Sequence, residues 1–412
     1  MTGQNGIVRE ISWRDIFPWL VLFRTNFLAL RASVLFVACL GTLAAPLGWR
    51  LAESLWLSEE ALQDSQFRGF VEQQRAWPTR ITPSSSPVEG GLTRAEQMVR
   101  HPLQEGLGAA WRRLVGPFRV VFQAGPLGGA QCLYLLTGIL WSLMVWGFVG
   151  GTIARVAVVN IGLEEDPGIV NSITFAWRRL RSLAMAPVLP LPVMMLFSLP
   201  VVLLGWLMRY DAGVLLGGLL WFFVLLVAFA VTWLLVGLVL GWPFMPAVIV
   251  TEEGGDHFEA FHRSYSYVYN SPLHYAFFWL LAGLLGLLGC WTVDTMADTT
   301  LQVVISTVSL GSGQERWRQI ADVSGGGDAD GMLWAGGRLI GFFEQFLGLV
   351  TTAFRYAIFF MSTATIYLLL RQQVDDAELD EVCRDADSLD EDVADDADSS
   401  VDPSDNAGPT EP

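Results

Sequence analysis

The chain has 412 residues, of which 52% are hydrophobic and 16% are charged, and its mean hydropathy is +0.43. Soluble domains carry about 25% charged residues, so this composition excludes an ordinary soluble domain. The formal net charge of −16 comes almost wholly from the C-terminus, where residues 375–412 hold 16 acids and one arginine. The rest is nearly neutral and lacks the basic surface that nucleic-acid binding needs.

Residues 1–31 precede the first apolar run and predict an amphipathic segment at the membrane interface. Trp13, Phe17 and Leu20 fall on one side of this segment at helical spacing. A cleavable signal peptide is not expected, because its apolar region would begin sooner than Ala32.

Uncharged runs of about 20 residues then alternate with polar loops, which is the pattern of helices that cross a hydrocarbon core of about 30 Å. We expect an all-α integral membrane helical bundle of about six spans within residues 32–371. The expected spans are Ala32–Trp49, Cys132–Ile153, Leu183–Leu207, Gly213–Leu240, Tyr275–Val293 and Val350–Leu370.

Arginines in the short loops predict the topology, since cytoplasmic loops carry more basic residues. The loop after the second span holds Arg155, Arg178, Arg179 and Arg181, whereas the loop after the third holds only Arg209. This asymmetry places the former loop and both termini in the cytoplasm of a cell with an inner membrane.

The two long loops, about 50–131 and 294–349, are then expected outside the cytoplasm. Residues Pro78–Gly91 are rich in Pro, Ser and Gly, and Asp322–Gly331 contain three successive glycines, so both predict flexible connections. Residues 106–121 have apolar side chains at helical spacing and could lie along the outer interface.

The acidic segment 372–412 predicts a disordered tail, because it has dense charge and few aromatic residues. A tail of this charge could bind a basic protein partner. The four cysteines, Cys39, Cys132, Cys290 and Cys383, have no CxxC spacing, so neither a disulfide framework nor a zinc site is expected.

Two further cytoplasmic segments predict amphipathic helices that lead into spans and suit the lipid headgroup layer. One is expected to begin at Asp166-Pro167, an N-cap followed by proline at the first helical position. The other is expected to begin at Asp256, with Glu259 completing a capping box.

The segment Gly241–Tyr265 joins an apolar run to an acidic, glycine-containing turn and then to a helix with the pattern Ala260-x-x-x-Ser264-Tyr265. This layout resembles multi-pass bacterial membrane proteins of unknown function. It is also similar to the membrane domain attached to some glycerophosphodiester phosphodiesterases. The resemblance covers roughly residues 130–295 and implies an architecture. It implies no activity, because the soluble catalytic domain is absent.

Arginines at the span ends are candidate lipid contacts. Arg155, Arg178, Arg179 and Arg355 could reach headgroup phosphates, which suit a planar guanidinium. The alternative for Arg155 and Arg355 is that the side chain simply extends to the interface to keep its charge in water.

The densest ionisable cluster contains His257 and His262 beside Glu252, Glu253, Asp256 and Glu259. A divalent metal site is one interpretation, but the histidines are five residues apart and do not share a helix face. Asp256 and Glu259 have structural explanations, as a cap and as a partner of Arg263. We therefore expect no metal, no cofactor and no enzymatic activity.

Two spans are interrupted. The third expected span carries four prolines, and the fourth runs into Gly241-Trp242-Pro243 and Pro246 within an uncharged stretch too long for one crossing. Transporters place binding sites at such breaks, yet no acidic or amide side chain lies in either one. The favoured hypothesis is a membrane scaffold or envelope-associated factor, and the alternative is a permease or lipid-handling transporter.

Overall fold

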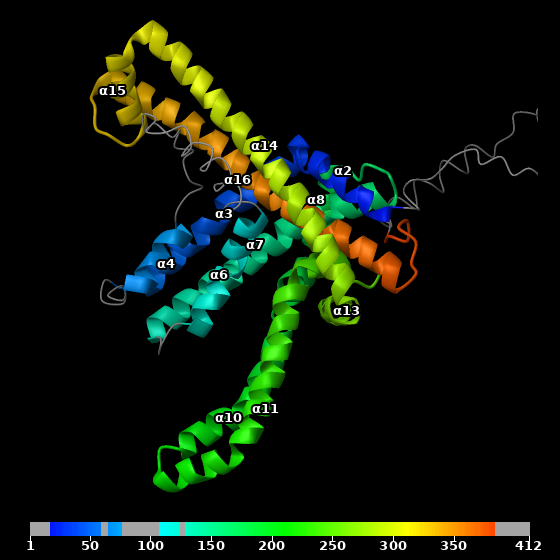
Figure 1. The fold of residues 1–412 in the computed structure, drawn as a ribbon. Helices are drawn as coiled ribbons and strands as arrows, with labels where there is room; N and C mark the ends of the chain where they lie inside the picture. Colours follow the sequence, from blue (N-terminus) through cyan, green and yellow to red (C-terminus); the bar gives the residue numbers. More distant parts are fainter. Residues whose placement is uncertain (1–16, 59–64, 76–106, 124–127, 384–412) are drawn as a thin grey trace, which may run out of the picture.

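The computed structural model describes residues 17–58, 65–75, 107–123 and 128–383, in which helices are the only regular secondary structure (Figure 1). The expected all-α class is confirmed. The helices are η1 (Pro18–Leu20), α2 (Val21–Ala29), α3 (Ala32–Trp56), α4 (Ser65–Arg75), α6 (Leu107–Gln123), α7 (Gly129–Gly162), α8 (Ile169–Arg178), α9 (Leu180–Met185), α10 (Pro190–Leu207), α11 (Asp211–Gly241), η3 (Trp242–Phe244), α12 (Met245–Thr251), α13 (His257–Asn270), α14 (Pro272–Ser312), α15 (Gln314–Ser324) and α16 (Gly331–Val374).

Six helical segments of the described chain are long and apolar enough to cross a membrane, as expected. They are Ala32–Trp56, Gly129–Gly162, Leu180–Leu207, Asp211–Thr251, Pro272–Ser312 and Gly331–Val374. Each extends beyond its expected span, because the helix continues into flanking residues that the apolar pattern does not mark. The 41 residues of α14 measure about 60 Å at 1.5 Å per residue, twice the thickness of a hydrocarbon core.

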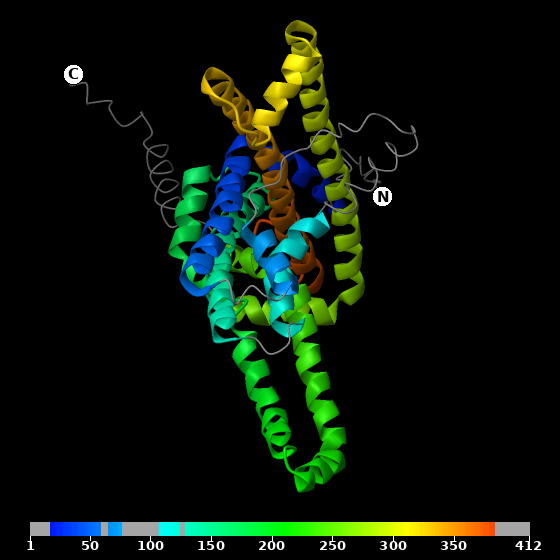
Figure 2. The same cartoon turned by 90° about the vertical axis from the view of Figure 1, so that its left-hand side faces the viewer.

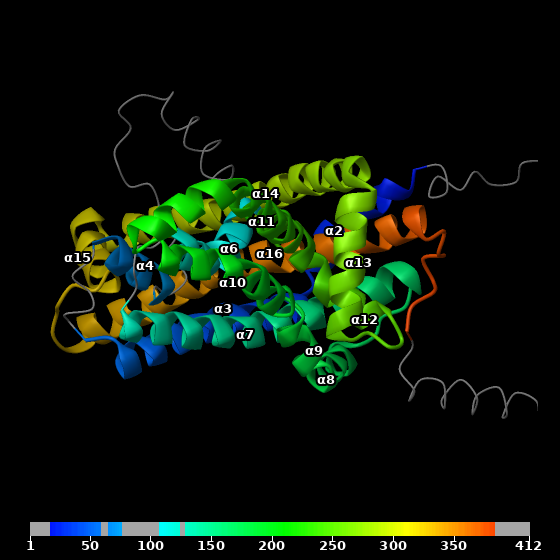
Figure 3. The same cartoon turned by 90° about the horizontal axis from the view of Figure 1, so that it is seen from below.

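The helices form three arms that diverge from one end of the molecule. The first arm contains α3, α4, α6 and α7, the second is the α10–α11 hairpin, and the third contains α14, α15 and the first half of α16. Figure 1 shows the second arm, in green, pointing away from the third, in yellow and orange, and Figure 2 shows the first arm between them. The helices α8, α9, α12 and α13 gather at the shared end, which we call the hub (Figure 3).

The second half of α16 is the centre of the core. Every residue from Thr351 to Arg371 is buried, which is typical of a helix that is packed on all sides. The helices α2, α3, α6, α7 and α14 pack around it. The second half of α16 therefore joins the first and third arms, and the second arm reaches it mainly through η3 and α12.

Two sequence interpretations of the outer segments are wrong. The loop expected at 294–349 is largely helical, because α14 continues to Ser312 and α16 already begins at Gly331. The segment 106–121 does not lie along an interface in its described part, since α6 packs between α7, α14 and α16. Its Trp111 stacks on Trp242 at 5.5 Å between ring centroids. Residues 78–91 lie outside the described part.

The break expected in the fourth span is confirmed. Helix α11 ends at Gly241, the chain passes through the single turn η3, and α12 begins at Met245. Pro243 and Pro246 are the second residues of the two following helices, within the first turn, where a proline needs no amide hydrogen. The third span is interrupted as well, between α9 and α10.

The predicted topology can be tested because several chain segments meet at the hub and must lie on the same side of the membrane. An ion pair of 3.1 Å between Arg31 and Asp166 places the start of the first span beside the loop after α7. We expect reporter fusions after residues 170, 260 and 412 to report a cytoplasmic location, and fusions after 90 and 320 to report the opposite side. A periplasmic signal at residue 170 would contradict the arginine rule for this chain.

Candidate functional site: an arginine-braced hub

Arg179 holds the end of α12. Its guanidinium donates hydrogen bonds to the backbone carbonyls of Ile249, Glu252 and Glu253, the latter two at 2.9 Å. The last carbonyls of a helix have no partner within the helix and carry its partial negative charge. A cation at this position satisfies these carbonyls and fixes where α12 ends.

Arg155 lies in the interior of the hub and is only 3% exposed. It donates hydrogen bonds to the carbonyls of Val250 at 3.0 Å and Cys383 at 2.7 Å. Its guanidinium lies 4.1 Å from the ring centre of Phe175, and that of Arg179 lies 4.6 Å from the same ring. This cation–π arrangement ties α7, α8 and α12 to the C-terminal end of the described chain.

Residues 375–383 fold back over the hub, and we call them the C-terminal strap. The Cys383 amide donates to the Thr251 carbonyl at 2.8 Å, and Arg371 donates to the Glu381 carbonyl. Val382 is buried. The strap lies so close to Gly162 that a Cβ atom there would be 2.5 Å from a backbone oxygen of Leu379.

The strap corrects the expected boundary of the disordered tail. Residues 372–412 were expected to form one disordered segment, and this is wrong for 372–383. The backbone of the strap is held by hydrogen bonds from Arg155 and Arg371, and a backbone carbonyl can accept such bonds whatever side chain its residue carries. The remaining tail, 384–412, lies outside the described residues.

An ionic network lies next to the strap and centres on Glu252. Its carboxylate accepts a hydrogen bond from the Tyr367 hydroxyl at 2.7 Å and lies 3.2 Å from both Arg263 and Arg371. The Glu252 side chain is 11% exposed. A carboxylate at this depth needs such partners, because an unpaired buried charge is very costly.

Arg263 extends the network toward the surface. It lies 3.0 Å from Glu259 and 3.7 Å from Asp375. Tyr267 donates a hydrogen bond to Asp375, and burial together with this bond raises the pKa of the Tyr267 hydroxyl, so it stays a neutral donor at physiological pH. These residues and His262 line an open polar hollow. Its arginines are already paired with carboxylates, which favours a bracing role.

A second buried ion pair joins two long helices away from the hub. Arg355 of α16 donates to both carboxylate oxygens of Asp294 in α14, each at 2.9 Å. Asp294 was not singled out from the sequence. The signal that could have found it is an acid at the end of an expected span, since charges there need a partner.

Three of the four arginines predicted to contact lipid headgroups have partners inside the protein, and lipid contact stays a prediction. Arg155 and Arg179 bind backbone carbonyls within the hub, and Arg355 pairs with Asp294. These guanidiniums therefore bind carbonyls and a carboxylate inside the protein. Arg178 is exposed, and the neighbouring Trp177 is 66% exposed.

The two expected helix caps have different outcomes. Asp256 caps α13, since its carboxylate accepts the Glu259 amide hydrogen bond at 2.7 Å, whereas the Glu259 side chain pairs with Arg263. The Asp166-Pro167 cap is wrong. Gly168, with φ of 68°, is the N-cap of α8, and Asp166 pairs with Arg31. A left-handed backbone conformation suits glycine and shifts the helix start.

Within the described residues, no group of three or more His, Cys, Asp and Glu side chains could hold a metal ion. No match emerges when the chain is compared with models of protein families, with curated proteins and with solved structures. The resemblance to phosphodiesterase membrane domains therefore stays a prediction. The chemistry that the hub offers is the satisfaction of buried carbonyls and carboxylates by arginine.

Two adjacent arginines provide a matched test of the hub. Replacing Arg179 by alanine removes the partner of three helix-end carbonyls, and hydrogen bonds from a charged group contribute about 1.5–3 kcal/mol each. We expect Arg179→Ala to lower the free energy of unfolding by about 3 kcal/mol, measured by thermal unfolding in one detergent. The exposed neighbour is the control, and Arg178→Ala should change stability by less than about 0.5 kcal/mol. Equal effects would contradict the bracing role.

The cap of α13 can be tested by limited proteolysis. Asp256→Ala removes the acceptor for the first turn and should destabilise α13 by about 1 kcal/mol. Faster cleavage between Thr251 and Pro272 is the expected result. His257→Ala changes an exposed neighbour and should cleave at the parent rate. If both variants are cleaved alike, the cap does not control this segment.

Proposed function

We propose that the chain is a membrane scaffold without catalytic activity, in which one hub holds three helical arms apart. The observation that carries this proposal is the second half of α16, which is buried on all sides from Thr351 to Arg371. A solid apolar core of this kind suits a part that must hold its shape.

The second arm has the exposed apolar surface through which a membrane scaffold would contact lipid or partner helices. Large apolar side chains are exposed along α10 and α11, among them Leu215 at 80% and Leu219 at 78%. Exposed apolar surface of this extent is covered by lipid or by partner helices. The second arm touches the body mainly near the hub, so most of its surface is free for either.

The hub would face the headgroup layer of the inner membrane on its cytoplasmic side, with both termini in the cytoplasm. Exposed Arg178 and Trp177 of α8 form a basic and aromatic edge that suits contact with lipid phosphates. The acidic residues after Cys383 suit a basic protein partner. Both contacts are proposals that follow from charge and exposure.

Site-specific photocrosslinking in growing cells tests the scaffold. A photoreactive amino acid would replace Leu215 or Leu219 in the second arm, and Leu310 or Met332 in the third. A scaffold should give protein adducts of one defined mass from neighbouring positions on the same arm. Phe360, in the core, is the control position and should give none. Lipid adducts alone at all four arm positions would contradict the proposal.

The runner-up is a lipid-handling transporter, which one observation favours. The break in the fourth span, at Trp242, borders an apolar cavity between the arms. Proteoliposomes with a fluorescent phospholipid would separate the two functions. A scaffold should leave the rate of lipid exchange between leaflets at the protein-free value, and faster exchange would favour the transporter.

A further inference from the structure

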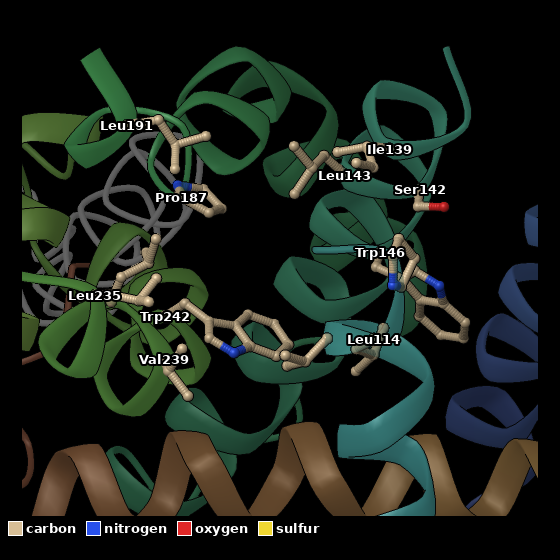
Figure 4. Close-up of a pocket in the computed structure, with 13 residues that line it drawn as sticks. Leu114, Ile139, Ser142, Leu143, Trp146, Pro187, Leu191, Leu235, Val239 and Trp242 are labelled. Carbon is tan, nitrogen blue, oxygen red and sulfur yellow. The ribbon is translucent and has the colours of Figure 1, made fainter. Parts of the chain in front are cut away.

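The first and second arms enclose a small cavity near the point where they separate. Its volume is about 80 Å³, and its walls come from α6, α7, the start of α10 and the end of α11 (Figure 4). Figure 4 shows Leu143 and Trp146 on one side facing Leu191 and Leu235 on the other. We call this space the wedge cavity.

The lining favours an apolar occupant. Nearly all of its surface is apolar, and it contains no charged residue. Its one hydroxyl, Ser142, already accepts a hydrogen bond from the Trp49 indole at 2.9 Å. The other polar side-chain atoms of the lining are the indole nitrogens of Trp146 and Trp242, whereas a buried water molecule typically makes about three hydrogen bonds. The chemistry therefore selects a hydrocarbon.

The position of the cavity along the helices places it within the apolar spans. On α7 it extends from Trp146 to Ile139, which is roughly 14–24 Å along the helix from Arg155 in the hub. The outward side chains beside it are apolar as well, including Leu136 and Leu140 of α7. The wedge cavity is therefore continuous with surface that lipid chains would cover in a bilayer.

We propose that the wedge cavity binds a segment of a few methylene groups from one fatty acyl chain of a membrane phospholipid, between the first and second arms. The occupant is apolar because the lining is apolar. It is a lipid chain because apolar, outward-facing surface surrounds the cavity at the depth of the hydrocarbon core. This binding site goes beyond the scaffold function and does not depend on any protein partner.

Photolabelling of the full chain tests the site. The protein would be reconstituted in vesicles of phosphatidylethanolamine and phosphatidylglycerol that contain a phospholipid with a diazirine in the middle of one acyl chain. After irradiation, mass spectrometry of peptides locates the labels. We expect them to concentrate on residues 139–146 and 235–242, which line the cavity.

A matched pair of variants on α10 separates this site from ordinary lipid contact. Leu191→Trp adds an indole to the cavity wall and should lower labelling of residues 139–146 by about tenfold, because the added ring takes the space. Leu196→Trp makes the same change at a side chain that is 69% exposed, and its labelling should equal that of the parent.

Leu235→Phe is a second, smaller filling change for the case in which Leu191→Trp does not fold, as judged by thermal unfolding. It should also lower labelling of residues 139–146. Labels spread evenly over the six spans, or equal labelling of the parent and the folded filling variants, would overturn the proposal. Neither outcome bears on the protein adducts that test the scaffold.

Discussion

A chain that ends at Gln373 should be less stable than the full chain by about 3–5 kcal/mol, the range measured when a buried charge loses its partner. This truncation removes the C-terminal strap and with it the Cys383 carbonyl that Arg155 binds. It also removes the Glu381 carbonyl that Arg371 binds. Arg155 would keep its bond to the Val250 carbonyl, and Arg371 would keep its ion pair with Glu252, so each guanidinium loses one acceptor. Thermal unfolding of the purified protein in one detergent measures the difference.

A chain that ends at Arg384 is the matched control. It keeps the strap and loses most of the acidic tail, so its stability should equal that of the full chain. The acidic composition alone predicts that both truncations are harmless. If the two truncated chains unfold at the same temperature, the strap does not stabilise the hub.

Breaking the ion pair between Arg355 and Asp294 should lower the free energy of unfolding by a similar amount. Either Arg355→Met or Asp294→Leu leaves the other charge among apolar helices, and the loss of one partner of a buried pair costs about 3–5 kcal/mol. The double variant removes both charges and should recover most of this loss, since apolar side chains can replace a buried pair. Unfolding of the parent, both single variants and the double variant gives the coupling energy.

The structural role of this pair predicts strong non-additivity. Two single changes that simply add in the double variant would mean that the two side chains stabilise the protein independently. A matched control is Arg316→Met on α15, an exposed arginine that should cost less than about 0.5 kcal/mol.

The sequence predicts the all-α class and the candidate spans because the length of an apolar run must match the thickness of the hydrocarbon core. Six helices long and apolar enough to cross a membrane lie at the predicted positions, and the Asp256 cap is confirmed, with its partner only three residues away. The break after Gly241 was predictable for the same reason, since proline acts on its own helix. Features that depend on residues close together in the sequence could therefore be predicted from it.

The candidate site could not be predicted in the same way. The partners of Arg155 are backbone oxygens 95 and 228 residues further along the chain, and no side-chain pattern marks them. An arginine at a span end has the same local sequence whether it meets a phosphate or a carbonyl. The strap was missed because its acidic composition outweighs the two apolar residues, Leu379 and Val382, that pack on the hub.

The strap also has a consequence for how the protein is made. A ribosome releases the spans in chain order, so α7, α8 and α12 enter the membrane long before Cys383 is synthesised. The Cys383 carbonyl that Arg155 binds lies 228 residues downstream, so this hydrogen bond forms only after the earlier spans are inserted. Closure of the hub therefore comes after the other helices of the hub have been synthesised. Nascent chains that stall before the last span is complete would expose an uncovered arginine to quality-control proteases.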